Sequence, residues 1–432
     1  MIKILLVITL VEGLILWPLQ IGNNLDEDIY STFFVVINFF VLLVVLAREK
    51  LPSWLYKIIF IFYSIKIVLL IFMYFNIDAI MNALSIRDVY AFFQPQAIDY
   101  MRGNTDVQVY SKIVAYIYII FGPIMRIPVF YNIIASVLAD IFFFKTLVEL
   151  NIPSRYVKLF TVMFMILPWR NVLSMFMVRE AFPTFLVIVS VYFFVRWWRQ
   201  REGKNFIYAI ISSIFSMAFH SGLAALPVVM MLAYILYDPR ENKWVFNFKT
   251  ICKFGIIVLI AGAILIAFGD VILYKFTLAF SSDKGLSEWS NLVINGAESN
   301  YLKGFSYTTI NDVFLQSPLR MIYFLLSPMP WDWRGVSDLL AFGIDSSVQL
   351  LGIWFAFEKM KYVANPYKKI IKVMLCIYIL LALVFGAGTF DAGTAMRHRA
   401  KFTSILLLID AMCIAGVKQN KNLLKAARGN NH

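Results

Sequence analysis

The sequence predicts an all-α integral membrane protein, a polytopic bundle of about 12 transmembrane helices with further interfacial or re-entrant helices. Composition is the first observation behind this fold class: 61% of the 432 residues are hydrophobic and only 15% are charged. A soluble protein of this length needs more charged side chains to cover its surface. The second observation is the recurrence of apolar stretches that approach the roughly 20 residues of a membrane span.

The apolar stretches run along the whole chain, so residues 1–432 are expected to form a single membrane domain. The first stretch follows Lys3 as in a signal peptide, but no small-residue cleavage site comes after Gln20, which favours a retained anchor. Residues 113–121 and 322–326 are too short to cross and are expected to be interfacial or re-entrant helices. The predicted spans are 3–19, 31–47, 57–75, 128–147, 156–168, 177–197, 205–219, 221–237, 253–269, 338–357, 370–388 and 400–416.

The formal net charge of +13 follows from where the cations lie. Lys and Arg gather in every second connection, the pattern that the positive-inside rule gives to cytoplasmic loops. This distribution accounts for the basic balance and excludes nucleic acid as a partner. With an even number of spans, both termini, including a tail at 418–432, are expected on the cytoplasmic side of the inner (plasma) membrane. The three cysteines lie far apart and indicate neither a disulfide framework nor a metal site.

Two long connections, 76–127 and 270–337, are expected on the outer face, which also holds most of the acidic residues. Function tends to lie on long loops held by a rigid scaffold. In the first loop Asp88 follows a span and lies among aromatic residues such as Tyr90. Its carboxylate is the favoured group to accept a proton or hold a metal. Asp99 is the second candidate. The alternative for each is the solvated face of an interfacial helix.

Further candidates lie at the outer ends of predicted spans. Arg179 and Glu180 either form a local ion pair or place Arg179 in a cavity, where it binds an anion. His220 occupies the turn between two short spans. A lone histidine there is more often a hydrogen-bonded structural group, although histidine titrates near neutral pH and can transfer protons. Trp331, in an aromatic turn, either anchors the chain at the headgroup level or carries the face of a sugar ring.

The strongest candidate site is the stretch 386–401. Three glycines interrupt a span where it leaves the membrane, and four basic residues follow: Arg397, His398, Arg399 and Lys401. Arginines two positions apart point to opposite sides of a helix but to the same side of an extended segment, and the glycines favour an extended or a bent path. Positive charge at an outer end runs against the orientation rule, so a compensating anion is expected. Phosphate fits through charge-assisted, bidentate hydrogen bonds. Anchoring to lipid headgroups is the alternative.

Four ionisable residues, Glu12, Lys66, Asp140 and Asp410, lie inside predicted spans. Charge within a bilayer is costly and indicates pairing or function. The sequence alone assigns no partners to these residues.

In their order, these motifs resemble those of known membrane enzymes over residues 75–420. The first outer loop, with Asp88-x-Tyr90 and Phe121-Gly122, resembles that of GT-C glycosyltransferases, and the region of Arg179-Glu180 is similar to a later pair of helices in that group. Three further motifs are similar to features of Wzy- and EpsG-type polysaccharide polymerases: Phe219-His220-Ser221, Pro328-x-Pro330-Trp331 and Arg397-x-Arg399.

The resemblance implies a GT-C-like fold and an integral membrane glycosyltransferase or polymerase of bacterial cell-surface polysaccharide assembly. Such an enzyme transfers a sugar or oligosaccharide from a polyprenyl-phosphate or polyprenyl-diphosphate carrier to a glycan acceptor at the outer face. Arg397, Arg399 and Arg179 are expected to clamp the carrier phosphate. Asp88 or His220 is expected to deprotonate the acceptor. The other expected substrate-binding residues are Glu180, Tyr90, Arg126, Trp331 and His398.

The resemblance implies no certain cofactor and leaves a divalent cation open; the remaining expected partners are membrane lipids. Two other functions stay open. A transporter or flippase of the lipid-linked saccharide would place ionisable groups near the bilayer midplane and show internal repeats, whereas the ionisable residues of this chain gather at the outer rim. An outer-face acyl- or phospho-transferase would also use cations and a histidine.

Overall fold

The computed structural model of the chain describes residues 27–73, 89–238, 243–248, 250–252, 299–363 and 365–429, with the single residues 255, 287 and 290. This described part is mostly helical, and its one sheet is an antiparallel pair of short strands, β1 (Tyr237–Asp238) and β2 (Lys243–Trp244). Contacts within the chain define two compact units, each described separately below. Unit 1 comprises Met1–Ile141 and Arg170–Phe185, and unit 2 comprises Phe142–Trp169 and Leu186–His432.

Unit 1 consists of long apolar helices with a shorter helical segment between them. α2 and α3 pack against each other, and α3 begins directly after Pro52, whose carbonyl accepts the Leu55 N–H at 2.9 Å. α6 ends at Gly122, whose φ of +88° is a conformation that residues with a Cβ rarely adopt. The elements are α2 (Glu27–Ala47), α3 (Ser53–Met73), η1 (Val89–Phe93), α5 (Gln94–Met101), α6 (Val109–Phe121), the first part of α7 (Arg126–Glu149) and the end of α9 (Pro168–Ser174).

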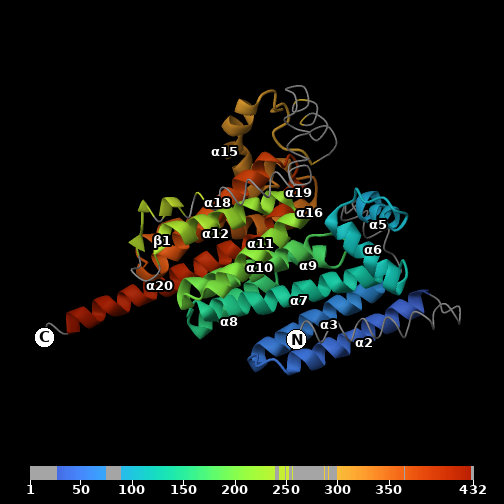
Figure 1. Ribbon diagram of the computed structural model, residues 1–432, viewed down its shortest axis with the longest axis horizontal. Helices are drawn as coiled ribbons and strands as arrows, with labels where there is room; N and C mark the ends of the chain where they lie inside the picture. The colour runs from blue at the N-terminus through green and yellow to red at the C-terminus, as the bar shows by residue number, and fades with distance from the viewer. Residues whose placement is uncertain are drawn as a thin grey trace. The chain divides into compact units, whose positions relative to one another are not determined.

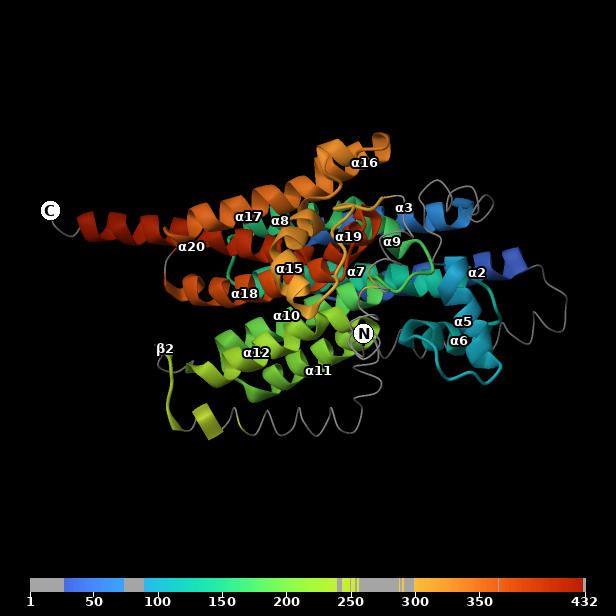
Figure 2. The same cartoon turned by 90° about the horizontal axis from the view of Figure 1, so that it is seen from above.

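Unit 2 is a helical bundle in which α18 packs against α12, α15 and α20, while α17 packs against α20. Figure 2 shows α17, α18 and α20 running side by side, and Figure 1 shows α15 standing at a steep angle to α18. The helices are α8 (Ser154–Met165), α10 (Ala181–Gln200), α11 (Gly203–Phe219), η2 (Ser221–Ala224), α12 (Ala225–Leu236), α15 (Ile310–Leu326), η3 (Pro330–Asp332), α16 (Val336–Ala341), η4 (Phe342–Ser346), α17 (Ser347–Met360), α18 (Asn365–Ala387), α19 (Ala392–Arg399) and α20 (Thr403–Gly429).

The crossing of α15 over α18 is close because Gly386 lies at the contact. A Cβ at this position would stand 2.8 Å from the Cα of Met321 in α15, which is shorter than real Cβ contacts. A glycine inside a helix costs stability relative to alanine, so this contact gives a packing reason for Gly386. Gly386 lies inside α18, which ends at Ala387, so the helix breaks within the glycine-containing stretch as the sequence predicts, but after Gly386.

The structure confirms a multi-pass helical membrane protein. Within its described residues, six helices are long and apolar enough to cross a membrane, and eight spans result if each of two bent helix pairs counts as one. Residues 205–219 and 221–237, predicted as spans, form shorter apolar helices. Residues 3–19 lie outside the described residues, as do 253–269 except for residue 255. Residues 113–121 form a short helix, α6, as predicted; its interfacial position stays a prediction. The six long helices are Ile29–Ala47, Ser53–Phe72, Arg126–Glu149, Ala181–Gln200, Asp338–Met360 and Tyr367–Ala387.

The prediction of a short helical piece at 322–326 is wrong in its extent. Those residues end a 17-residue helix, α15, which starts at Ile310. Thr309 and Asp312 form a capping box there, each side chain binding the backbone of the other residue. Because polar residues interrupt the first half of α15, an apolar-run criterion detects only its end.

Of the two paths predicted for the basic stretch, extended or bent, the extended one is wrong. Residues 392–399 form the helix α19, and the side chain of Asp391 caps its N-terminus by accepting the Thr394 N–H at 2.8 Å. The chain bends by 55° between α19 and the following part of α20. In a helix, residues two positions apart point to different sides, so Arg397 and Arg399 have different surroundings.

Candidate functional site

A pair of histidines in unit 2 is the centre of the candidate site. The Nε2 atoms of His220 and His398 lie 3.2 Å apart, within hydrogen-bond distance. His220 is the residue between α11 and η2, and His398 lies in the last turn of α19. Both imidazoles are partly buried. The sequence singled out both histidines without any indication that they meet, because 178 positions separate them.

The backbone around His220 determines which nitrogens carry hydrogen. The Gly222 N–H donates to Nδ1 of His220 at 3.2 Å, so this nitrogen is an acceptor. A neutral His220 therefore carries its hydrogen on Nε2 and donates it to Nε2 of His398. Neutral His398 then carries its own hydrogen on Nδ1. Both Nε2 atoms cannot carry hydrogen while the histidines stay paired, so His398 can accept a proton at Nε2 only when the pair opens.

Phe385 of α18 forms the floor beneath the histidine pair. Its ring centroid lies 4.8 Å from that of His220 and 5.0 Å from that of His398. The Nζ atom of Lys401 lies 5.6 Å from the same centroid, in cation–π geometry, and the lysine is fully buried. Arg397, adjacent to His398 in α19, is partly buried. Three helix ends thus bring two histidines and a buried lysine around one aromatic ring.

The hydrogen bonds of Arg399 lie outside this cluster. Its side chain is 1% exposed, and Nη1 donates to the carbonyl oxygens of Leu325 at 2.9 Å and Ser327 at 2.6 Å. Nη2 donates to Oγ of Ser346 at 3.0 Å. The carbonyls at a helix C-terminus lack partners within the helix, and Arg399 supplies partners at the end of α15. These contacts give Arg399 a structural role, and its predicted role as a phosphate clamp stays a prediction.

The end of the second long loop fixes the start of α19. The Tyr301 N–H donates to the Phe390 carbonyl at 3.0 Å, and the Tyr301 hydroxyl donates to the Thr389 carbonyl at 2.9 Å. Burial raises the pKa of Tyr307 to about 12, so its hydroxyl stays protonated and donates to the Ala387 carbonyl at 2.9 Å. Residues from 299 onwards therefore hold the segment between α18 and α19, which positions His398.

Arg320 of α15 completes this packing. Its Cζ lies 4.7 Å from the ring centroid of Tyr307 and 4.4 Å from that of Phe390, and its guanidinium also donates to the Phe305 carbonyl. The side chain is fully buried, and burial lowers its pKa. Sequence reasoning missed Arg320 because α15 was recognised only from its apolar end. Trp331 lies in η3 and is 70% exposed, a position that suits either of its two predicted roles.

Unit 1 holds the other predicted site residues. Asp88 lies outside the described residues. Tyr90 is 43% exposed, and Asp99 is partly buried in α5. Arg126 is 2% exposed and donates from Nη1 to Oγ of Ser31 at 3.1 Å.

The remaining pair of candidates lies just before α10. Arg179 donates to Oε1 of Gln108 at 2.7 Å, and Glu180 is 2% exposed. The predicted pocket shared by Asp88, His220 and the basic stretch stays a prediction.

A charged network inside unit 1 gives partners to two of the intramembrane residues. Lys66 of α3 donates to Oγ of Ser136 at 2.8 Å, and Arg170 donates to the same oxygen at 3.3 Å. Arg170 also forms an ion pair with Asp140, with 2.6 Å between Nη2 and Oδ1. All three ionisable side chains are at most 5% exposed. Arg170 was missed because it lies two positions beyond the predicted span 156–168.

Comparisons with known proteins add no assignment. The sequence matches no protein-family model, and neither a curated protein nor a solved structure matches it. Among the residues that the structure describes, no three His, Cys, Asp or Glu side chains gather as a metal site would require.

Proposed function

We propose that the chain is a membrane glycosyltransferase or polymerase that transfers a saccharide from a polyprenyl-phosphate or polyprenyl-diphosphate carrier to a glycan acceptor. The observation that supports this most is the His220–His398 pair over Phe385, beside the basic residues Arg397 and Lys401. Such a site combines a group that can accept a proton with charge that can hold a phosphate. These are the two requirements of a transfer in which a hydroxyl attacks and a phosphate leaves.

The proton step begins at the bond between the histidines. An acceptor hydroxyl that displaces the N–H of His220 from Nε2 of His398 can give its proton to that nitrogen. His398 then becomes positively charged next to Arg397 and Lys401, which is unfavourable unless an anion is present. Protonation and phosphate binding therefore favour each other, so deprotonation of the acceptor occurs chiefly when the carrier is bound.

The leaving step uses the cations. Arg397 is the partly exposed cation of α19, and we assign it to the carrier phosphate, which it can bind in bidentate geometry. Lys401 is fully buried and contributes positive charge in a region of low dielectric constant. As the glycosidic bond to the carrier breaks, negative charge grows on the phosphate and both cations stabilise it. Arg399 acts as a positioning residue, because its hydrogen bonds join α19 to the end of α15.

Transfer of labelled saccharide from a polyprenyl-diphosphate donor, measured in membranes that contain the chain, tests this proposal. His398→Gln and Arg397→Gln are expected to reduce the rate by about a hundredfold or more. His432→Gln and Lys303→Gln are the matched controls, since they change the third histidine and an exposed lysine of the loop. Unchanged rates in the first two variants, at equal amounts of folded protein, would overturn the proposed mechanism. In that case Asp88→Asn tests the other predicted base.

A transporter of the lipid-linked saccharide is the second candidate, and one observation favours it. Lys66, Asp140 and Arg170 are buried charges on three helices of unit 1, and ionisable groups within the membrane are typical of transport pathways. In proteoliposomes without acceptor, a transporter moves the donor across the bilayer and leaves it intact. The proposed transferase instead requires acceptor and releases the carrier phosphate. Donor movement that is lost in Lys66→Met but kept in His398→Gln would favour the transporter.

A further inference from the structure

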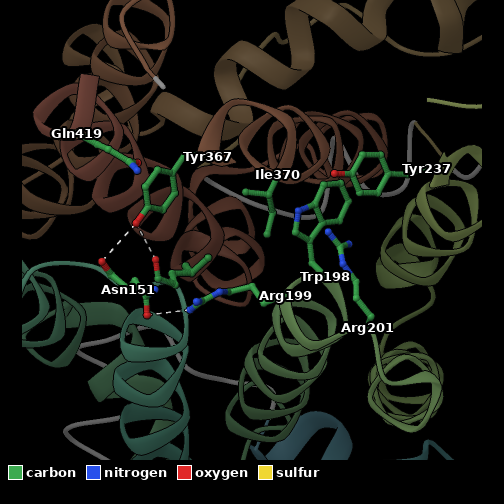
Figure 3. Close-up of a pocket in the computed structure, with 9 residues that line it drawn as sticks. Asn151, Trp198, Arg199, Arg201, Tyr237, Tyr367, Ile370 and Gln419 are labelled. Carbon is green, nitrogen blue, oxygen red and sulfur yellow. Dashed lines mark hydrogen bonds between the residues drawn. The ribbon is translucent and has the colours of Figure 1, made fainter. Parts of the chain in front are cut away.

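A hollow lies in unit 2, near the opposite end of α18 from the histidine pair. Its volume is about 410 Å³, which lies in the range of small-ligand sites. Figure 3 shows its walls: the stacked rings of Trp198 and Tyr237 on one side, and Tyr367 with Asn151 on the other. Arg199 and Arg201 line it as well. The lining residues come from the ends of α7 and α10 and the turns after them, from β1, from the first turns of α18 and from the middle of α20.

The hollow and the candidate site lie near opposite ends of α18. Tyr367 lies in the first turn of α18 and Phe385 in the last, 18 positions further on, which corresponds to about 27 Å of helix. The hydrocarbon core of a bilayer is about 30 Å thick. The two sites therefore lie at opposite ends of one membrane-spanning helix. The positive-inside pattern of the sequence assigns the end with Tyr367 to the cytoplasmic side.

The hollow is positively charged. Of its nine lining residues, two are arginines and none is acidic. Arg199 donates to a neutral partner, Oδ1 of Asn151, at 2.9 Å. The carboxylate of Glu149 accepts a hydrogen bond from Gln200, and that of Glu202 pairs with Lys204. In the described part of unit 2, nearby carboxylates are thus engaged by residues other than the two arginines, so the hollow suits an anion.

The conformation of Arg201 supports a role in binding. Its φ of +66° lies in the left-handed region, where a helix end ordinarily has glycine or asparagine, since a Cβ is strained there. Its Cζ lies 5.9 Å from the ring centroid of Tyr237. A strained residue at a site is a reason to look for function. An arginine here places a guanidinium over the aromatic wall, which glycine would not do.

The aromatic wall indicates where in the membrane the hollow lies. Trp198 and Tyr237 stack with centroids 4.1 Å apart and planes inclined by 5°, and Tyr237 also contacts Trp244 at 5.3 Å. Tryptophan and tyrosine gather at the level of lipid headgroups. Phosphate is the usual anionic group at the headgroup level of a membrane. Arginine is the residue that binds phosphate in bidentate geometry.

We infer that this hollow binds a phosphate group, held by Arg199 and Arg201 against the Trp198–Tyr237 wall. Its source is either the headgroup of an anionic lipid or free phosphate. The site is independent of the proposed transferase function, since it shares no residue with the histidine cluster. It would let the protein bind a phosphate group at the membrane face opposite to the candidate site.

Binding to the purified full-length chain in detergent tests this inference, with native mass spectrometry as the readout. Three probes are compared: dioctanoyl phosphatidic acid, dioctanoylglycerol, which has the same acyl chains without phosphate, and inorganic phosphate. Arg199→Gln and Arg201→Gly are expected to weaken binding of phosphatidic acid by about tenfold or more, because each removes charge-assisted hydrogen bonds. Lys204→Gln, an exposed lysine three positions beyond Arg201, is the control for loss of one charge and should leave binding unchanged.

Arg201→Gly separates binding from folding. Glycine adopts a positive φ without strain, so this variant should keep or raise the thermal midpoint of the protein while it weakens binding. Arginine-dependent binding of phosphatidic acid alone identifies a lipid headgroup as the ligand, and equally tight binding of inorganic phosphate identifies free phosphate. Both results support the site. Equal binding of dioctanoylglycerol, or binding that persists in the Arg199→Gln, Arg201→Gly double variant, would overturn it.

Discussion

Asp140 of α7 and Arg170 of α9 form an ion pair of 2.6 Å between helices of unit 1, and both side chains are at most 5% exposed. Lys66 joins them through the hydroxyl of Ser136, which accepts hydrogen bonds from both cations. One carboxylate therefore faces two cations in a region that excludes water. Removing the carboxylate leaves two uncompensated charges, whereas removing Lys66 leaves a neutral pair.

Asp140→Asn should consequently cost far more stability than Lys66→Met. Breaking a buried ion pair by removing one partner costs about 3–5 kcal/mol, and in this network the loss also leaves Lys66 and Arg170 facing each other. Thermal unfolding in detergent, followed by intrinsic fluorescence, measures the difference. Asp106→Asn, at an exposed carboxylate of the same unit, is the control for the substitution itself. Equal destabilisation by Asp140→Asn and Lys66→Met would contradict the network.

Arg397 and Arg399 lie two positions apart, but substitution of Arg399 should chiefly reduce stability, whereas substitution of Arg397 should chiefly reduce activity. Arg399→Lys removes donors from buried carbonyl groups at the end of α15, which is expected to cost about 1–3 kcal/mol of unfolding free energy. Arg397→Gln, at a partly buried position, should reduce transfer activity and leave the thermal midpoint nearly unchanged. Measuring the midpoint and the transfer rate on the same preparations distinguishes the two. A stability loss at Arg397 as large as that at Arg399 would argue against a ligand-binding role for Arg397.

Asp312, in the capping box of α15, gives a prediction about acid stability. Hydrogen bonds from the Thr308 hydroxyl and from the Thr308 and Thr309 backbone N–H groups lower the pKa of Asp312 to about 2. A carboxylate whose pKa is lower in the folded state stabilises the fold above the ordinary aspartate pKa of about 4, and this contribution disappears as pH falls towards 2. The wild-type midpoint should fall more steeply than that of Asp312→Asn over this window. Identical pH profiles would exclude the contribution of this cap.

Glycine at 386 and at 388 offers a matched test of the α15–α18 crossing. A Cβ at Gly386 would stand 2.8 Å from the Cα of Met321, a backbone atom that cannot move aside, so Gly386→Ala should cost about 1–3 kcal/mol. A Cβ at Gly388 would meet nothing closer than the Val384 carbonyl oxygen at 3.8 Å, an ordinary contact. Gly388→Ala should therefore be close to neutral in thermal unfolding. The reverse order of stabilities would show that the crossing is not as close as described.

Composition and apolar runs were sufficient to predict the helical membrane class, because a membrane-spanning helix is a continuous apolar segment that can be recognised from local sequence. The same signal missed the first half of α15, because Asn311, Asp312 and Gln316 interrupt the apolar run there. The capping box does mark the start of this helix in the sequence. Pairings such as Lys66 with Ser136 were not predictable at all. They depend on which helices become neighbours, and neither spacing nor composition carries that information for residues 70 positions apart.

The candidate site shows the same division. Its residue types were recognised, since the chain has only three histidines and the cations at 397–401 lie at a predicted outer end, against the positive-inside rule. The role of Arg399 was not, because it follows from the helical geometry of α19, which places this side chain against the carbonyls of α15. Phe385, the floor of the histidine pair, has no sequence signal that distinguishes it from the other phenylalanines of the chain.

Gly222 supports the histidine pair, and replacing it should impair function more than stability. A Cβ at Gly222 would lie 3.1 Å from Nδ1 of His220 and 3.0 Å from Cζ of Phe385, so Gly222→Ala pushes both rings and strains the bond between His220 and His398. The backbone itself is not strained, and the crowded atoms are side-chain atoms, so a stability loss of no more than about 1–2 kcal/mol is expected.

Transfer activity should fall by about tenfold or more in Gly222→Ala, with a shifted pH profile, since proton transfer by a histidine pair depends on its geometry. Ser221→Ala, at the exposed neighbouring position, is the control and should behave as wild type. If Gly222→Ala kept both the rate and the pH profile of the wild type, the His220–His398 bond would not be part of the reaction. A change in the pH profile is the decisive readout, because a purely structural defect reduces the amount of active protein and leaves the profile unaltered.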